Sequence, residues 1–304
     1  MKKIMLGKRL PVSAVAMGCM RLADTKETPD RVIGTALDLG INFFDHADIY
    51  GGGRCEEIFG SWLASRPSVR DRITIQTKCG IRKGCYDFSK RHILEAAEGS
   101  LRRLRTDHVD VLLLHRPDTL MEPEEVAAAF DALEQSGKVR FFGVSNHNPL
   151  QIELLKTAVR QPLVADQLQF SLPEAGLITS GLNVNMKNSE SVMHDGSALE
   201  YLRIQGITLQ AWSPFQGGFF NGPFVGDREK YPALNNKLDE TALKYGVSPN
   251  AVAAAWILRH PAKIQVISGS VSPGRMREIA SGAEIELTRE DWYALYLAAG
   301  FRLP

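Results

Sequence analysis

The sequence is poor in cysteine. Its 304 residues contain only four, Cys19, Cys55, Cys79 and Cys85, with no CxxC pair and no histidine at a zinc-like spacing. The pattern predicts free thiols in a reducing compartment rather than a disulfide framework or a zinc site. Cys79 follows Lys78, whose charge could lower the thiol pKa. We favour the simpler interpretation, a small residue that happens to lie near a pocket.

Long apolar runs are also missing. The longest, Ala251 to Leu258, is far shorter than the roughly 20 residues that a membrane-spanning helix needs. The opening stretch MKKIMLGKRL has two lysines but too short an apolar part for the core of a signal peptide. We therefore expect no membrane span and a cytoplasmic protein.

Neither sign of charge dominates the chain. Lysine and arginine together number 36 and aspartate and glutamate 35, which gives a formal net charge of +1. No long run of like charges suggests a nucleic-acid surface or an anionic-membrane surface. A small molecule is the expected partner. The oligomeric state stays open, with a monomer plausible.

Strand-like and helix-like segments alternate along most of the chain. The stretch INFFDHADIY at 41–50 shows the pattern: apolar residues lead to Asp45, and Tyr50 follows just before three glycines. Helical periodicity, proline at helix starts and glycine at helix ends separate such segments. The predicted strands are Val15–Met17, Ile41–Asp45, Ile73–Thr77, His108–Leu114, Val139–Val144, Leu163–Phe170, Ile207–Trp212 and Ile264–Ile267.

Eight strands with helical crossovers predict a closed (β/α)8 TIM barrel, with 1–304 forming a single domain. A short β-hairpin at Lys3–Val12 precedes the barrel, and an extra helix follows it. An open doubly wound sheet is the alternative, but the first strand-to-helix turn lacks a glycine fingerprint. The irregular stretch Ser171–Gly196 is either the rim of the substrate pocket or a plain surface insertion.

Polar residues gather at the carboxyl ends of the predicted strands. Asp45 and Tyr50 follow the second strand, Lys78 the third and His115 the fourth, and Ser145 and Asn146 follow the fifth. Each of them alone is more readily explained as a structural residue. In a closed barrel, however, all of these ends meet at one mouth, so the sequence predicts a proton-transfer site there.

The motifs DHADIYGGG, TKCG and LLLHRPD, in this order on successive strands, resemble the catalytic motifs of the aldo-keto reductase superfamily. The resemblance covers essentially the whole chain, and GGGRCEEIFGSWL is most similar to the bacterial YdhF-type oxidoreductases. It implies a catalytic tetrad of Asp45, Tyr50, Lys78 and His115. It also implies an NADPH-dependent oxidoreductase that reduces aldehyde or ketone carbonyls to alcohols.

The later motifs GVSNHNP, ADQLQFSL, AWSPFQGG and ISGSVSPGR are similar to the cofactor-binding segments of the same superfamily. Arginine suits the 2′-phosphate of NADPH, because its planar group forms two parallel hydrogen bonds. Met20 stands where many members have an aromatic pocket wall, which predicts an adaptable, broad pocket. The implied cofactor residues are Gly18, Met20, Ser145, Asn146 and Gln167; Trp212, stacking on the nicotinamide ring; Ser213, Phe215, Gly217 and Gly218 at the pyrophosphate; and Ser270, Val271, Ser272 and Arg275.

The residues themselves suggest a mechanism. Carbonyl reduction needs a hydride, which no side chain supplies, and a proton, for which Tyr50 is the candidate donor. Lys78 would stabilise the phenolate, Asp45 would fix Lys78, and a neutral His115 would orient the substrate oxygen. No metal is required. Metal ligation by Asp45, His46 and His115 is weaker, because adjacent strand residues point to opposite faces.

Two further hypotheses remain open at this stage. One is a nucleotide-binding regulatory subunit on the same barrel, with little or no turnover. The other is a metal-dependent barrel hydrolase, which a chelator would inactivate.

Overall fold

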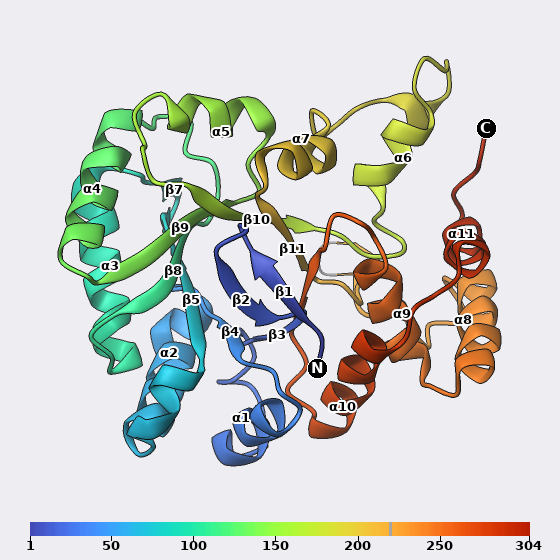
Figure 1. The fold of residues 1–304 in the computed structure, drawn as a ribbon, viewed down its shortest axis with the longest axis horizontal. Helices are drawn as coiled ribbons and strands as arrows, with labels where there is room; N and C mark the ends of the chain where they lie inside the picture. The colour runs from blue at the N-terminus through green and yellow to red at the C-terminus, as the bar shows by residue number, and fades with distance from the viewer. Residues whose placement is uncertain (219–220) are drawn as a thin grey trace.

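The computed structural model describes residues 1–218 and 221–304, and its centre is a closed barrel of eight parallel strands (Figure 1). Each strand pairs with its neighbour around the ring, and β10 closes on β9. The predicted fold class is confirmed. The barrel strands are β3 (Val15–Gly18), β4 (Phe43–Asp45), β5 (Thr74–Cys79), β8 (Val109–Leu114), β9 (Val139–Ser145), β10 (Leu163–Gln169), β11 (Thr208–Trp212) and β12 (Gln265–Ser268).

Helices surround this barrel. Several helices start as the sequence indicates, with a proline in the first turn and a capping side chain just before it. At the start of the helix that begins at Pro149, for example, the Asn148 side chain accepts from the Gln151 backbone and forms a capping box. Outside the barrel lie α1 (Pro29–Asp38), α2 (Arg54–Ala64), α3 (Lys90–Leu104), α4 (Pro123–Gln135), α5 (Pro149–Lys156), α7 (Ala198–Gln205), α9 (Pro249–Leu258) and α10 (Pro273–Ser281), with α6 (Gly176–Leu182), α8 (Pro232–Tyr245) and α11 (Arg289–Ala298) added.

The predicted hairpin, β1 (Lys3–Leu6) and β2 (Leu10–Ser13), lies across the amino-terminal end of the barrel (Figure 1). Its turn residue Gly7 donates to the Thr208 hydroxyl at the start of β11 at 2.9 Å. Ile4, Leu6 and Val12 pack with apolar residues that point into the barrel. The hairpin therefore closes this end with an apolar layer, and polar residues occupy the opposite end.

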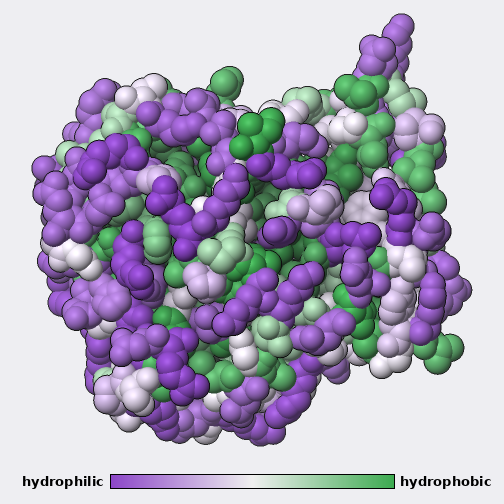
Figure 2. Space-filling model, in the orientation of Figure 1, coloured by the Kyte–Doolittle hydropathy of each residue, from purple (hydrophilic) through white to green (hydrophobic). Residues whose placement is uncertain are grey.

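On the face drawn in Figure 2, hydrophilic residues cover most of the area and hydrophobic residues lie among them in small groups. Among residues 1–218 and 221–304, no helix combines the length and the apolar character needed to cross a bilayer.

The structure differs from the prediction in two places. The stretch expected to be irregular, Ser171–Gly196, contains α6 and a short 3₁₀ helix, η3 (Ser189–Ser191). A small hairpin after β5, made of β6 (Ile81–Arg82) and β7 (Cys85–Tyr86), was not predicted. Each of its strands has only two residues, too short for an alternating pattern to be visible in the sequence.

Candidate active site

Strand β4 carries Asp45 to the mouth of the barrel. Asp45 points inward, while the next residue, His46, packs edge-on against Phe59 of α2, with ring centroids 4.6 Å apart. The chain then reaches Tyr50 and turns through Gly51, Gly52 and Gly53, whose φ angles are 58°, 64° and 93°. Side chains other than glycine rarely adopt these angles, so the three glycines allow the sharp turn that follows Tyr50.

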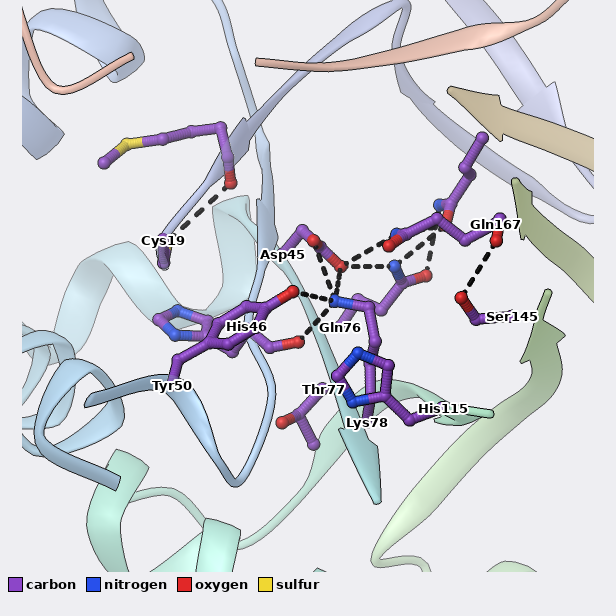
Figure 3. A network of polar contacts seen from close by, with 12 residues as sticks. Cys19, Asp45, His46, Tyr50, Gln76, Thr77, Lys78, His115, Ser145 and Gln167 are labelled. Atoms are coloured by element: carbon purple, nitrogen blue, oxygen red, sulfur yellow. Dashed lines mark hydrogen bonds and ion pairs between the residues drawn. The ribbon is translucent and has the colours of Figure 1, made fainter. Parts of the chain in front are cut away.

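Lys78 contacts both of its predicted partners at the end of β5 (Figure 3). Its ammonium nitrogen lies 2.9 Å from each oxygen of the Asp45 carboxylate and 3.0 Å from the Tyr50 hydroxyl. It also donates to the backbone carbonyl of His46 at 2.8 Å. The Lys78 side chain has no exposed surface. A buried cation is thus fixed directly against the Tyr50 hydroxyl.

Burial and charge act in opposite directions on this pair. Burial lowers the pKa of Lys78, but Asp45 and Tyr50 outweigh it, and the pKa is raised above its ordinary value. Burial raises the pKa of Tyr50, and the charge on Lys78 opposes this only in part. Lys78 is therefore protonated and Tyr50 carries its proton at neutral pH. Stabilisation of the phenolate, expected from the sequence, is present but does not bring the pKa below the ordinary value.

His115 lies just beyond β8 and faces Tyr50, with the two rings nearly perpendicular and their centroids 6.1 Å apart. Burial, then the charges of Lys78 and Arg116, holds its pKa well below the ordinary value. The ring is therefore neutral at pH 7. Its buried Nδ1 has no hydrogen-bond partner in the described part of the chain. The sequence-based hypothesis also assigns a neutral His115 to this position.

The metal alternative requires His46 to lie beside Asp45 and His115. His46 points out of the barrel, and burial lowers its pKa to about 3. No group of three or more potential metal ligands occurs among the residues that the structure describes. The possibility of a reactive Cys79 is wrong, because burial, with a smaller contribution from Asp48, raises its thiol pKa well above the ordinary value. All four cysteines are free thiols, as predicted.

Three of the predicted nicotinamide-binding residues contact one another. Trp212 donates its indole N–H to the Asn146 side chain at 3.1 Å, and Asn146 donates to the Ser145 hydroxyl at 2.8 Å. Asn146 has a φ of 62°, in the left-handed region that asparagine adopts more readily than most other residues. The guanidinium of Arg116 lies 5.7 Å from the centroid of the Trp212 ring. The ends of β8, β9 and β11 are thereby linked at the mouth.

Gln167 points into the barrel rather than only toward the mouth. Its Nε2 donates to Asp45 at 3.2 Å and to Gln210 at 3.1 Å. With this nitrogen engaged, its carbonyl oxygen is the atom left to meet a ligand. The structure thus joins a predicted cofactor residue directly to the predicted tetrad.

The segment after β11 folds back on itself. Ser213 has a φ of 49° and Gly218 one of 121°, and Gln216 N–H donates to the Ser213 carbonyl at 3.0 Å. A Cβ added at Gly217 would lie 2.0 Å from the Tyr231 hydroxyl, so a larger residue there would displace the Tyr231 side chain. Phe215, the remaining residue predicted here, is partly buried against the core.

The last predicted segment, at 270–275, leads into α10. Ser272 caps the helix by accepting from the Arg275 backbone at 3.5 Å, and the Ser272 N–H reaches the Ser270 hydroxyl at 3.3 Å. Such long bonds leave backbone donors available at a helix amino terminus, where anions bind well. Val271 packs partly against the core, and the Arg275 side chain is exposed.

Gly18 and Met20 lie at and just beyond the end of β3, the strand that pairs with β12. Gly18 ends β3 and pairs with Asp45 of β4. A Cβ at Gly18 would lie 3.2 Å from the Ser268 carbonyl, so a small residue suits this position. Met20 is 44 % exposed, which places a flexible apolar side chain near the opening.

Two buried glutamines that contact the site were not predicted to belong to it: Gln76 in β5 and Gln210 in β11. A signal for them was present, because Gln76 stands two residues before Lys78 and Gln210 two before Trp212, so each shares a face with a predicted site residue. Both lie inside their strands rather than at the ends, so no local pattern sets them apart from polar residues that only fill the barrel.

Comparison with known proteins agrees with this geometry. Residues 14–296 match the model of the aldo/keto reductase family. A 6-dehydroglucose reductase of Agrobacterium fabrum is 38% identical, with 98% of each chain covered. The oxidoreductase YdhF of Escherichia coli is 36% identical, over 96% of this chain and 95% of YdhF.

Solved structures agree as well. An aldo/keto reductase from Klebsiella pneumoniae in complex with NADP and acetate superposes with a TM-score of 0.79 at 22% identity, covering 100% of this chain and 97% of that one. At this identity the match shows the shared fold. Together with the family match, the sequence relatives confirm the predicted class of enzyme, an NAD(P)H-dependent oxidoreductase that acts on carbonyl groups. The chain belongs to the aldo/keto reductase family.

Proposed function

We propose that this protein reduces aldehyde or ketone carbonyls to alcohols with NADPH, and that Tyr50 donates the proton. The observation that carries the proposal is the position of the Lys78 ammonium, which contacts the Asp45 carboxylate and the Tyr50 hydroxyl at about equal distances, 2.9 and 3.0 Å. A tyrosine hydroxyl against a buried cation is a proton donor whose conjugate base is stabilised as it forms.

Each residue of the tetrad has a separate part. Tyr50 gives its proton to the carbonyl oxygen, and the charge of Lys78 stabilises the phenolate that remains. Asp45 keeps Lys78 charged and in place. His115 is neutral and faces Tyr50, so it can donate one hydrogen bond to the substrate oxygen without competing as an acid. This arrangement orients the carbonyl for attack at carbon.

The residues around the mouth fit a dinucleotide cofactor. When bound, NADPH supplies the hydride that no side chain can provide. Gln167 offers its carbonyl oxygen to a carboxamide, and Trp212 lies at the end of β11 on the same mouth. The amino terminus of α10 with Arg275 suits a phosphate, and a Cβ built at Gly269 or Gly274 meets little or nothing, so the backbone there is open to approach.

The relatives suggest where to look for the substrate. Two related proteins are 6-dehydroglucose reductases, from Agrobacterium fabrum and Novosphingobium aromaticivorans. On this basis a polyhydroxylated aldehyde is the first candidate class for this chain. An exposed, flexible Met20 favours acceptance of simpler aldehydes as well.

A substrate screen tests the proposal. The purified protein is mixed with NADPH, or with NADH, and a panel of aldose-derived aldehydes, simple aldehydes, α-dicarbonyls and ketones, and oxidation of the reduced nicotinamide is recorded. We expect turnover, a higher kcat/KM with NADPH than with NADH, and no effect of a chelator. Tight NADPH binding without turnover on any carbonyl would instead support a regulatory nucleotide-binding subunit.

A further inference from the structure

Glutamines fill one layer of the barrel interior, next to the Lys78–Tyr50 contact and farther from the mouth. Gln76, Gln210 and Gln265 are fully buried, on β5, β11 and β12. The interior of such a barrel is ordinarily packed with branched apolar side chains. Burial of a primary amide is unfavourable unless its donors and acceptors are satisfied. A layer of glutamines here therefore calls for an explanation beyond filling space.

The amides satisfy one another and converge on Asp45 (Figure 3). Gln76 donates from Nε2 to the Asp45 Oδ1 atom at 2.6 Å and to the Gln210 carbonyl oxygen at 2.9 Å. Gln167 donates to the same two acceptors at 3.2 and 3.1 Å. Two NH₂ groups thus bridge one carboxylate oxygen and one amide oxygen.

The charge of Asp45 sets the direction of every hydrogen bond in this layer. An ionised carboxylate only accepts, so Gln76 and Gln167 must turn their NH₂ groups toward it. Their second hydrogens go to the Gln210 carbonyl oxygen, and the Gln210 NH₂ group then points to the carbonyl oxygens of Gln76, at 3.1 Å, and Gln265, at 2.9 Å. Gln265 in turn donates to the Ser13 backbone carbonyl at 2.8 Å.

This network crosses the barrel rather than following one strand. Strands β4 and β5, which carry Asp45 and Gln76, are not adjacent to β11, which carries Gln210. Asp45 and Gln76 are paired in register on their own side, as are Gln167 and Gln210 on theirs. The orientation of the Asp45 carboxylate is therefore fixed from both walls of the barrel, and Lys78 is held against Tyr50 by a carboxylate that cannot rotate freely.

We propose that Gln76, supported by Gln210, is a positioning residue for carbonyl reduction: it orients the Asp45 carboxylate that holds Lys78 against Tyr50. The inference rests on the proposed function, because it assigns a role within that reaction. Gln76 touches neither Tyr50 nor Lys78 through its amide, so its effect passes through Asp45.

The test compares two glutamines of the same layer. Gln76→Met removes the donor to Asp45 and keeps a side chain of similar length, whereas Gln265→Met removes amide bonds that do not reach Asp45. We expect Gln76→Met to lower kcat for carbonyl reduction by about 10- to 100-fold. Its Kd for NADPH and KM for the carbonyl should change little, and Gln265→Met should keep kcat within about twofold of the wild type.

A second variant separates orientation from simple packing. Gln76→Glu keeps the shape, and in its protonated form it still donates one O–H to Asp45. Burial and the neighbouring carboxylate raise the pKa of such a group. We therefore expect Gln76→Glu to be most active at acidic pH and to lose kcat as the pH rises and the carboxyl ionises, while Gln76→Met stays low across the range.

The outcomes distinguish this inference from the proposed function. Equal kcat losses in Gln76→Met and Gln265→Met, or no loss in either, would overturn the positioning role while wild-type turnover stands. A dependence of kcat on pH in Gln76→Glu that follows the wild type at every pH would also overturn the positioning role. A wild-type protein that reduces no carbonyl would end both proposals. Thermal unfolding of each variant shows whether a lost activity reflects a lost fold.

Discussion

Asp45 is buried, with an exposed side-chain fraction of only 3%, and it accepts from one cation and two amides. The negative charge of Asp45 offsets the free-energy cost of burying the Lys78 ammonium. Asp45→Asn keeps the shape but leaves Lys78 buried without an anion. We expect the free energy of unfolding to fall by about 3 to 5 kcal/mol, as for other broken buried pairs. Urea unfolding at pH 7 measures this, and a loss below about 1 kcal/mol would contradict it.

The same pair predicts a dependence of stability on alkaline pH. The folded-state pKa of Lys78 is raised, so its stabilising contribution is complete below the unfolded-state pKa, near 10.4. That contribution is lost as the pH rises through the higher folded-state value. In Asp45→Asn this alkaline loss should be much smaller than in the wild type.

Asp48, between Asp45 and Tyr50, is a second titrating residue near the site. Burial raises the pKa of Asp48 to about 7, and the negative charge of Glu56 acts in the same direction. The positive charges of Arg103 and Lys78 oppose this increase only in part. The folded state therefore holds a proton that the unfolded chain releases near pH 4, and stability falls as the pH rises from about 4 to about 7.

Asp48→Asn removes this dependence. We expect the difference in Tm, Asp48→Asn minus wild type, to increase between pH 5 and pH 8. The reason is that only the wild type loses stability through titration of Asp48 over that range. Thermal unfolding at a series of pH values provides the measurement. A constant difference between the two proteins would show that the Asp48 carboxyl does not titrate there.

At the scale of elements, helix α2 is what supports the turn after Tyr50, since it begins at Arg54 directly after the glycines. It packs closely on α3 at Gly60. A Cβ at Gly60 would lie 2.1 Å from the Arg103 carbonyl oxygen and 2.7 Å from the Leu104 Cα atom. Both are backbone atoms of the last turn of α3. A backbone atom cannot move aside as a side chain can, so this contact fixes the distance between the helices.

Two glycine-to-alanine substitutions test the importance of this contact. Gly60→Ala is expected to lower the free energy of unfolding by about 1 to 3 kcal/mol or more through overpacking. Gly34→Ala in α1 is the matched control, because a Cβ there meets nothing within 4 Å. It should stabilise the protein by roughly 0.5 to 1 kcal/mol through the better helix propensity of alanine. Equal effects of the two changes in urea unfolding would contradict the packing argument.

The barrel as a whole brings together residues from most of its strands, so cofactor binding should stabilise the entire domain. At 100 times its Kd, NADPH is expected to add about 2.7 kcal/mol to the free energy of unfolding. Arg275→Met should raise the Kd for NADPH by roughly tenfold, since a hydrogen bond between charged groups contributes about 1.5 to 3 kcal/mol.

NADH, which lacks the 2′-phosphate, provides the control in the same thermal-shift experiment. Its stabilising effect should be the same on the wild type and on Arg275→Met. If the substitution weakens both cofactors equally, Arg275 does not recognise the 2′-phosphate.

Features that depend on neighbouring residues could be predicted from the sequence, whereas contacts between residues far apart in the chain could not. The barrel strands and the Asp45, Tyr50, Lys78 and His115 positions follow from local patterns and from the resemblance, and the fold class is confirmed. Short-range patterns could not show that Gln76 meets Gln210, 134 positions later, because closure of the barrel creates that contact. Nor could they show that burial outweighs Lys78 in setting the pKa of Tyr50.

The most direct test of the central claim is Tyr50→Phe, with kcat for carbonyl reduction and Kd for NADPH measured on the same preparation. Phenylalanine keeps the ring that faces His115 and removes only the hydroxyl that Lys78 contacts. Loss of a general acid predicts a fall in kcat of about 10²- to 10⁴-fold, with an unchanged Kd for NADPH. A Tyr50→Phe protein that reduces carbonyls at the wild-type rate would show that the proton comes from elsewhere.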